Sequence, residues 1–374
     1  FIMNKKVIWF VIVVVIALLA IVVIYRIGKS VTTVEPIKIG AIISETGVAA
    51  AFGEMSRKGI ALAVEEINSS GGIGGKNVSV IFEDDQTDPK VSSGLFQKLT
   101  GIDKVSAIIG SNFDFVTQPL FSLAETKRMV VVSPSNPRIP GAFDTNPYSF
   151  VMMTEFSDIV RKFDSYLKQT QYNQMGMVRF ESSFAESIEG TLNDMQKEMG
   201  KKSLVTETYK QIGNNDFRTI IIKLKQAKVD LVFLDMIGND PVTFVTQAKQ
   251  LGYAPKIVTH VGIQDALAMK EVDPNIFSSV ASINWNVSTD SFVKKFTDKY
   301  GVNPDKSANR AYDAVYILAQ AISETPDTTL LPKTLESKSF TTPNGEFKFN
   351  SNHAASNTEV RVEVVKDGKL VELK

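Results

Sequence analysis

The sequence predicts an α/β protein with two lobes, each built on a doubly wound parallel sheet, and one N-terminal transmembrane helix before them. Two observations predict the lobes. Short apolar segments with the length of strands alternate with segments whose apolar residues have helical spacing, and this series occurs twice in succession. The segment Ile67–Pro89 (INSSGGIGGKNVSVIFEDDQTDP) contains a helix end, a glycine turn, a buried strand and a new helix start. Alternation of this kind favours parallel sheets with helices on both faces.

The N-terminal helix is predicted from Val7–Tyr25, a run of nineteen residues without a charge. As a helix, this run would be about 28 Å long, close to the thickness of the bilayer hydrocarbon. A secretory signal peptide has a shorter apolar core and then a small-residue cleavage site, which Ile24–Gly28 does not offer. We therefore expect residues 1–29 to be an uncleaved signal anchor with the body on the extracytoplasmic side, and a cleaved signal peptide is the alternative. Residues 30–36 are expected to form a linker.

Composition excludes several classes of protein. With 374 residues, 44% of them hydrophobic and 22% charged, the chain is long enough for two or three packed domains. It has no cysteine, so disulfides, thiolate metal sites and cysteine nucleophiles are excluded. The net charge is zero overall, with +3 over residues 1–35 and −3 over the rest. A mildly acidic body gives no electrostatic signal for nucleic-acid binding.

The first series of elements begins with the apolar strand Ile37–Ile43. The helix that follows, Ala49–Asn68, has apolar residues at helical spacing and ends at a serine–glycine cluster. Asp88 and Pro89 mark another helix start, because aspartate is a good N-cap and proline fits the first helical turn. The remaining predicted elements are the strands Val78–Phe82, Val105–Gly110 and Met129–Val132 and the helix Val91–Leu99.

A second series with the same alternation starts after residue 150. Its predicted elements are the helices Phe156–Thr170, Phe184–Met199, Asp216–Lys225 and Pro241–Leu251 and the strands Met175–Arg179, Leu204–Tyr209, Asp230–Leu234 and Lys256–Val258. The tail departs from the alternation, because the helices Asp290–Tyr300 and Ala308–Ile322 follow each other directly. After the predicted strand Glu346–Phe349, an Asp367–Gly368 turn joins two alternating segments into a predicted hairpin.

Several segments, taken in order, carry a resemblance to a known family. They are the strand IKIGAII, Phe52-Gly53 at a helix start, the segments VEEINSSGGIGGK and VIFEDDQTDP, Thr117-Gln118-Pro119, FVTQAKQLG and AYDAVYILA. Together they resemble the type I periplasmic binding proteins, most closely the branched-chain amino acid receptors of ABC importers. The resemblance implies two lobes joined by three crossovers, a small-molecule ligand held between them, and an ABC permease as membrane partner. On this basis, the first lobe comprises residues 37–150 plus 285–341, and the second comprises residues 151–284 plus 342–374.

The resemblance places the ligand site in loops that follow the carboxyl ends of the strands, as the rule for open α/β sheets also predicts. Phe52 matches an aromatic residue that covers the ligand in the family, and a core position at the helix start is the alternative. Asp114 falls where the amino acid receptors have a ligand-binding serine, and capping of the following helix is its alternative role. The predicted ligand-binding residues are Phe52, Phe113, Asp114, Phe115, Ser133, Ser135, Phe184, Met236, Ile237, His260 and Trp285.

Three departures from the family pattern argue against binding of a free α-amino acid. Asp114 would repel a ligand carboxylate at short range. The loop after Ser133 is two residues shorter than usual, and Val261 stands where a glutamate would pair with the ligand ammonium. Because an unpaired buried ion is costly, we expect an apolar or aromatic ligand with few polar groups, for example an amino acid derivative. Some of the aromatic residues named above are expected to belong to the core instead.

The sequence contains no catalytic or metal-binding pattern. Asp84, Asp85 and Asp88 are interpreted as a solvated strand end and a helix cap rather than as a cation site. The glycine cluster at residues 71–75 follows a helix, whereas a dinucleotide-binding loop follows a strand. We therefore expect no enzymatic activity, no cofactor and no metal. A ligand-sensing ectodomain that signals to a separate membrane partner is the alternative function.

Overall fold

The computed structural model describes residues 35–134, 146–260, 262–269, 271–284, 288–355 and 360–373, together with residue 9 and residues 13–17. The chain divides into two compact units, Phe1–Pro36 and Ile37–Lys374, which are described separately. In the first unit, Trp9 and residues 13–17 are helical and exposed. Within the described ranges, no helix is both long and apolar enough to cross a membrane. Most of the predicted span, Val7–Tyr25, lies outside those ranges.

The first sheet of the larger unit is parallel throughout and has the strand order β2-β1-β3-β4-β5. On β1, Ile39 and Ala41 join the core cluster on one face, and Ile42 joins the cluster on the other. Burial on both faces explains why this strand is apolar almost throughout instead of alternating. The strands are β1 (Ile37–Ile43), β2 (Val78–Asp84), β3 (Ala107–Ile109), β4 (Val131–Ser133) and β5 (Ser149–Val151).

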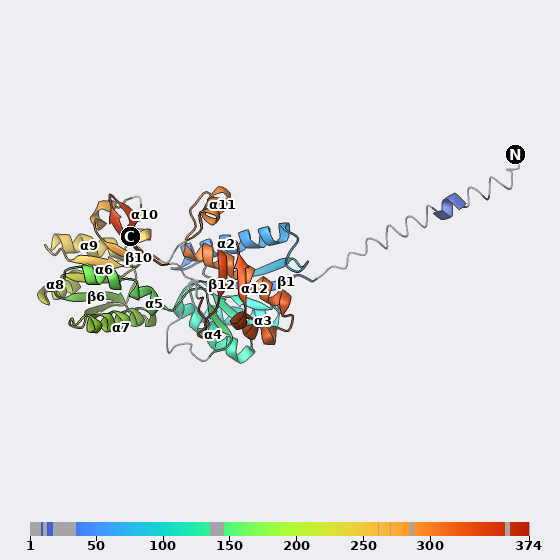
Figure 1. Ribbon diagram of the computed structural model, residues 1–374, viewed down its shortest axis with the longest axis horizontal. Helices are drawn as coiled ribbons and strands as arrows, with labels where there is room; N and C mark the ends of the chain where they lie inside the picture. The colour runs from blue at the N-terminus through green and yellow to red at the C-terminus, as the bar shows by residue number, and fades with distance from the viewer. Residues whose placement is uncertain are drawn as a thin grey trace. The chain divides into compact units, whose positions relative to one another are not determined.

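Helices cover both faces of the first sheet. Phe96 of α3 and Phe121 of α4 pack on one face, and α2 and α12 lie side by side on the other (Figure 1). The predicted start of α3 is confirmed, because the Asp88 side chain accepts hydrogen bonds from the backbone N–H groups of Lys90 and Val91. The helices of this part are α2 (Ala50–Ser69), α3 (Pro89–Gly101), α4 (Asp114–Lys127), α11 (Asp290–Tyr300), α12 (Lys306–Glu324) and α13 (Leu331–Ser337).

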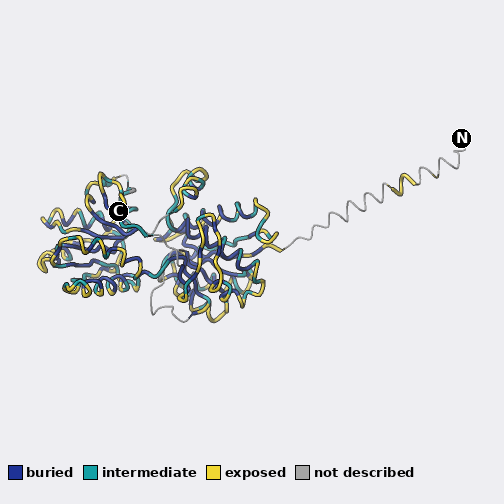
Figure 2. The backbone as a smooth tube through the Cα atoms, in the orientation of Figure 1, coloured by how far each residue is buried: buried dark blue, intermediate teal, exposed yellow. Residues whose placement is uncertain are grey.

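The second sheet has seven strands in the order β14-β13-β10-β9-β8-β6-β7. The strands β6 to β10 run parallel, and β13 and β14 form an antiparallel hairpin at one edge, as predicted. Figure 2 shows these strands buried between helices whose outer faces are exposed. The strands are β6 (Met175–Phe180), β7 (Val205–Tyr209), β8 (Leu231–Asp235), β9 (Lys256–Thr259), β10 (Ala281–Asn284), β13 (Arg361–Lys366) and β14 (Lys369–Glu372).

The helices of the second sheet differ from the predicted series in two places, one of which is the helix Gly262–Ala268, which was not predicted. The predicted helix Phe156–Thr170 is two short helices, because Lys162 and Phe163 form a turn between them. The helices are α5 (Phe156–Arg161), α6 (Asp164–Gln169), α7 (Ser183–Glu198), α8 (Arg218–Gln226), α9 (Asp240–Gln250) and α10 (Gly262–Ala268).

The chain stays with the first sheet longer than we predicted. The strands β11 (Ser339–Thr342) and β12 (Gly345–Lys348) form an antiparallel pair in which Phe340 lies opposite Phe347, and both rings are buried. Phe347 and Ala355 belong to the same core cluster as α12. The predicted return to the second lobe at residue 342 is therefore too early, because these buried side chains hold the segment against the first sheet through Ala355.

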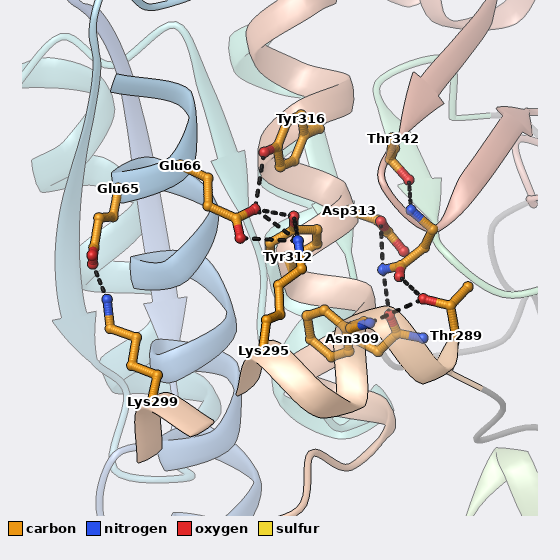
Figure 3. Close-up of polar contacts among 12 residues, drawn as sticks. Glu65, Glu66, Thr289, Lys295, Lys299, Asn309, Tyr312, Asp313, Tyr316 and Thr342 are labelled. Carbon is orange, nitrogen blue, oxygen red and sulfur yellow. Dashed lines mark hydrogen bonds and ion pairs between the residues drawn. The ribbon is translucent and has the colours of Figure 1, made fainter. Parts of the chain in front are cut away.

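Polar contacts join α11 to α2 and α12 (Figure 3). The Nζ of Lys295 on α11 lies 2.9 Å from Glu66 Oε1 on α2. The hydroxyls of Tyr312 and Tyr316 on α12 also donate to the Glu66 carboxylate, and Lys299 pairs with the neighbouring Glu65. These contacts hold α11 to the first sheet at the point where the chain has returned from β10.

Candidate functional site

Small polar side chains follow the strands of the first sheet at their carboxyl ends. Ser44 follows β1, Asp85 follows β2 and Ser111 lies just after β3, and all three are fully buried. The Ser44 hydroxyl donates to Asp85 Oδ1 at 2.6 Å, and the Ser44 and Ser111 hydroxyl oxygens are 3.2 Å apart. Ser133, at the end of β4, donates to the Ser111 carbonyl oxygen at 3.1 Å. The sheet thus gathers these groups at one edge, where an open α/β sheet binds its ligand.

The direction of these hydrogen bonds follows from Asp85. An ionised carboxylate can only accept, so the single Ser44 hydrogen is directed to Asp85. In the contact between the two serines, Ser111 must therefore be the donor. The Ser133 hydrogen is directed to a main-chain carbonyl. The hydroxyl hydrogens of these three serines are consequently used within the protein, and none is left to donate to a ligand carboxylate.

Three predicted aromatic residues come together beside these serines. The rings of Phe52, near the start of α2, and Phe113 are 5.5 Å apart with an edge-to-face geometry. The ring of Phe115 lies 5.9 Å from that of Phe113, and its side chain is 41% exposed. Asn112 Nδ2 donates to the Phe52 carbonyl oxygen at 3.2 Å and so links the two loops. We refer to Phe52, Phe113 and Phe115 as the aromatic trio.

The position of Asp114 bears on its alternative role as a helix cap. Asp114 is the first residue of α4, and the N-cap position belongs to Phe113, which makes no side-chain capping bond. The side chain of Asp114 lies outside the described part of the structure. Ser135, Val261 and Trp285 also lie outside it.

At the carboxyl ends of β8 and β9, the second sheet carries an aspartate–histidine pair. His260 Nε2 lies 2.8 Å from Asp235 Oδ1, and both side chains are almost fully buried. Asp235 Oδ2 accepts the backbone N–H of Phe180 at 3.2 Å. The rings of Phe184 and His260 are 6.1 Å apart between centroids and nearly perpendicular, and Phe184 also packs on Phe156 at 4.4 Å. The predicted residues Phe184 and His260 are therefore neighbours.

Asp235 is a residue of this site that the sequence analysis did not select. Its signal was an acidic side chain directly after the apolar run Leu231–Leu234, which is unusual at the end of a buried strand. Met236, which was selected, is buried in the core cluster that contains Phe244 and Ile263. Ile237 is half-buried in the loop before α9.

The acidic cluster after β2 stabilises loops. Asp84 Oδ1 accepts the backbone N–H groups of Glu45 and Gln86, each at 2.9 Å, and its Oδ2 accepts the Thr46 hydroxyl at 2.7 Å. Across the described ranges, no group of three or more His, Cys, Asp or Glu side chains is arranged to hold a metal ion. These contacts agree with the interpretation of the cluster as a strand end.

Comparisons with known proteins agree on the fold. The model of the family described as periplasmic binding protein matches residues 36–369. The leucine-, isoleucine-, valine-, threonine- and alanine-binding protein of Pseudomonas aeruginosa is 25% identical over 354 residues, which cover 91% of this chain and 93% of that protein.

Solved structures also match. The branched-chain amino acid substrate-binding protein LivJ of Streptococcus pneumoniae, in complex with isoleucine, has a TM-score of 0.76 at 23% identity. The alignment covers 90% of this chain and all of LivJ. An ABC-transporter solute-binding protein of R. palustris, in complex with benzoate, has a TM-score of 0.75 at 19% identity and covers 90% of this chain and 95% of its own. At these identities the structures show a shared fold.

Proposed function

Because the chain belongs to the type I periplasmic binding proteins, of the branched-chain amino acid-binding kind, we propose that it is the solute-binding protein of an ABC importer. Members of this family are solute-binding proteins and not enzymes. In this proposal the two lobes close by a hinge motion on a small molecule, and the closed form is presented to a permease in the membrane.

We further propose that the ligand is apolar or aromatic with few polar groups, and the aromatic trio is the observation that carries this proposal. The partly exposed Phe115 ring offers a face for stacking, which is worth about 1 kcal/mol beyond its buried area. The inward-directed hydrogens of Ser44, Ser111 and Ser133 leave no serine hydroxyl donor for a ligand carboxylate on this side. Relatives described as binding isoleucine and benzoate indicate that the fold accommodates both ligand classes.

Calorimetry on residues 37–374, which form one compact unit, tests the proposal. The titrants are leucine, isoleucine, benzoate and an aromatic amide such as phenylacetamide. We expect the aromatic amide to bind most tightly, because it has a ring and no carboxylate. Tighter binding of leucine than of every aromatic compound would contradict the ligand class. If none of these four compounds and no compound of a wider metabolite library bound to the protein, the solute-binding function would be contradicted.

A matched pair of variants locates the site. Phe115→Ala is expected to weaken binding about tenfold, because it removes the stacking face together with the apolar area that it buries, in total about 1.4 kcal/mol. Ile222→Ala on α8 removes a side chain of similar exposure, 44%, and is expected to leave binding unchanged. Equal effects of the two substitutions would place the site elsewhere.

We also propose that residues 1–29 anchor the protein in the membrane as an uncleaved helix, on the strength of the uncharged run Val7–Tyr25. Expression of the full chain followed by membrane fractionation and intact-mass measurement tests this. The full-length mass in the membrane fraction is expected. Release of a shorter protein into the medium would identify a cleaved signal peptide instead.

A further inference from the structure

His353 lies in the last segment that packs on the first sheet, between β12 and β13, and its side chain is buried. Its Nδ1 is 3.2 Å from the main-chain carbonyl oxygen of Ser149, at the start of β5. Its Nε2 is 2.9 Å from Glu336 Oε1 on α13. Each ring nitrogen of this histidine therefore faces an oxygen on a different element.

Both of these oxygens are acceptors. A main-chain carbonyl cannot donate, and neither can an ionised carboxylate. A neutral imidazole carries a hydrogen on one nitrogen alone, so it would leave one of the two contacts without a donor. The imidazolium form carries a hydrogen on both nitrogens and satisfies both contacts. The geometry around His353 thus matches the charged form of the ring.

The remaining contacts of His353 fix the ring and its segment against β5. The imidazole stacks on the Phe150 ring with 4.4 Å between centroids and 13° between planes, which suits a cation over an aromatic face. The Val151 N–H donates to the His353 carbonyl oxygen at 3.0 Å, and the Ala355 N–H donates back to Val151 at 3.0 Å. The neighbouring Asn352 side chain donates to Glu155, which precedes α5 of the second sheet.

His353 therefore joins two stretches of chain that both lead into the second sheet. After β5 the chain continues to α5, and after Ala355 it continues to β13. Within the described residues, the ionisable groups in contact with His353 or the residue before it are Glu336 on α13 and Glu155 before α5. The contacts to β5 are a carbonyl oxygen and an aromatic ring.

We propose that His353 is a pH-sensitive clasp, in which the imidazolium holds β5, α13 and residues 349–355 together, and loss of its second proton loosens this joint. Histidine is the side chain whose charge ordinarily changes between pH 5 and 8. In the imidazolium form both contacts of the ring have a donor, and one of them loses its donor when the ring becomes neutral. Looser contacts among β5, α13 and residues 349–355 change how readily the two lobes close. This last step rests on the proposed function.

Nitrogen-15 NMR of the imidazole rings tests the clasp without any ligand. The chain has two histidines, so spectra of the wild type and of His353→Gln assign both rings. At pH 6 we expect protons on both nitrogens of His353. In Glu336→Gln, which removes the facing charge from a partly exposed position, we expect His353 to lose its second proton at a lower pH than in the wild type.

Glu324→Gln is the matched control, because Glu324 also belongs to an exposed ion pair near α13, with Lys338. It is expected to leave the His353 titration unchanged. A His353 ring with one proton at pH 6, or the same titration in Glu336→Gln as in the wild type, would overturn the proposal. A separate binding experiment tests the link to the ligand. If a ligand is found, its affinity is expected to depend on pH more strongly in the wild type than in Glu336→Gln. If none is found, the proposed function fails while the NMR result still decides the clasp.

Discussion

The buried acids of the two sheets differ in how their charge is compensated. In the first lobe, Asp85 after β2 and Asp313 on α12 each have one carboxylate oxygen without a hydrogen-bond partner among the described residues. On the second sheet, both oxygens of Asp235 accept hydrogen bonds, one from His260 and one from the Phe180 backbone. An incompletely paired buried charge is a cost, whereas a fully paired one depends on its partners. The same substitution, aspartate to asparagine, should therefore have different consequences at the three positions.

Asp235→Asn is expected to have the largest effect. The amide can no longer accept from both His260 and the Phe180 N–H, and it removes the charge that faces the buried histidine. We expect the free energy of unfolding to fall by about 3 kcal/mol, the lower end for breaking a buried pair. Urea unfolding followed by circular dichroism measures it. Asp216→Asn, at an exposed position near the start of α8, is the control and should change the free energy of unfolding far less. A similar loss of unfolding free energy in both variants would show that the paired, buried Asp235 contributes no more than the exposed Asp216.

Asp313→Asn is expected to be stabilising at alkaline pH. Burial raises the pKa of Asp313 to about 6 from its ordinary value of 3.8. The folded protein therefore binds this proton more tightly than the unfolded chain, so the penalty for the ionised form is absent below about pH 4 and complete above pH 6 to 7. That penalty is about 3 kcal/mol. We expect a gain of about 2 kcal/mol at pH 8, because Arg310 loses a nearby negative charge in the variant.

The structure allows Asp313→Asn to fold, because Asn344 Nδ2 donates to Asp313 Oδ1 at 3.0 Å and an amide oxygen can accept that bond. Unfolding at pH 5 and at pH 8 gives the slope for both proteins. The variant should lose less stability between these two pH values than the wild type. Equal slopes would show that the Asp313 charge is compensated in a way that the hydrogen bonds do not reveal.

The aromatic residues at the two strand ends should also differ. Phe184→Leu is expected to reduce the free energy of unfolding by about 1 kcal/mol, because Phe184 packs on Phe156 and approaches His260. Phe115→Leu should change it by less than about 0.5 kcal/mol, because the Phe115 side chain is partly exposed. Thermal unfolding of both variants checks this order. The reverse order would mean that the aromatic trio is part of the core of the first lobe and not a surface for a ligand.

Asp85→Asn is expected to have the smallest effect of the three asparagine substitutions. Asp85 Oδ1 accepts from the Ser44 hydroxyl at 2.6 Å and from the Thr87 N–H at 2.8 Å, and an amide oxygen can keep both bonds. The amide nitrogen would take the place of the oxygen that has no partner. We expect a change below about 0.5 kcal/mol in urea unfolding. A loss as large as that of Asp235→Asn would show that the charge itself orders Ser44 and Ser111.

Local sequence signals predicted much of the fold. The Asp88–Pro89 helix start and the strand Ile37–Ile43 were both confirmed, because capping chemistry and apolar runs act over a few residues. The short strands β5, β10 and β11 were not predicted. A three-residue strand such as β5 has no period to detect, and it is defined by its pairing with β4.

Which polar residues contact each other depends on the order of the strands in each sheet, and we could not predict that order from the sequence. Asp235 and His260 are 25 positions apart and meet because β8 and β9 are neighbours. Glu336 and His353 are 17 positions apart and meet because the hairpin of β11 and β12 turns the chain back. Residue type alone therefore suggested His260 as a polar group of the site but did not suggest Asp235 as its partner.

The edge of the second sheet has a consequence for handling the protein. The strand β14 is the last in the order, and it covers β13, in which Val364 and Val365 are buried. Lys369 and Glu372 on β14 place charges along the open side, which discourages edge-to-edge pairing between molecules. Trimming the chain after Gly368, by design or by a protease, would expose β13 as a new edge without those charges. Preparations that lose these last residues should accordingly aggregate during expression and storage, so protein prepared for crystallisation should retain them.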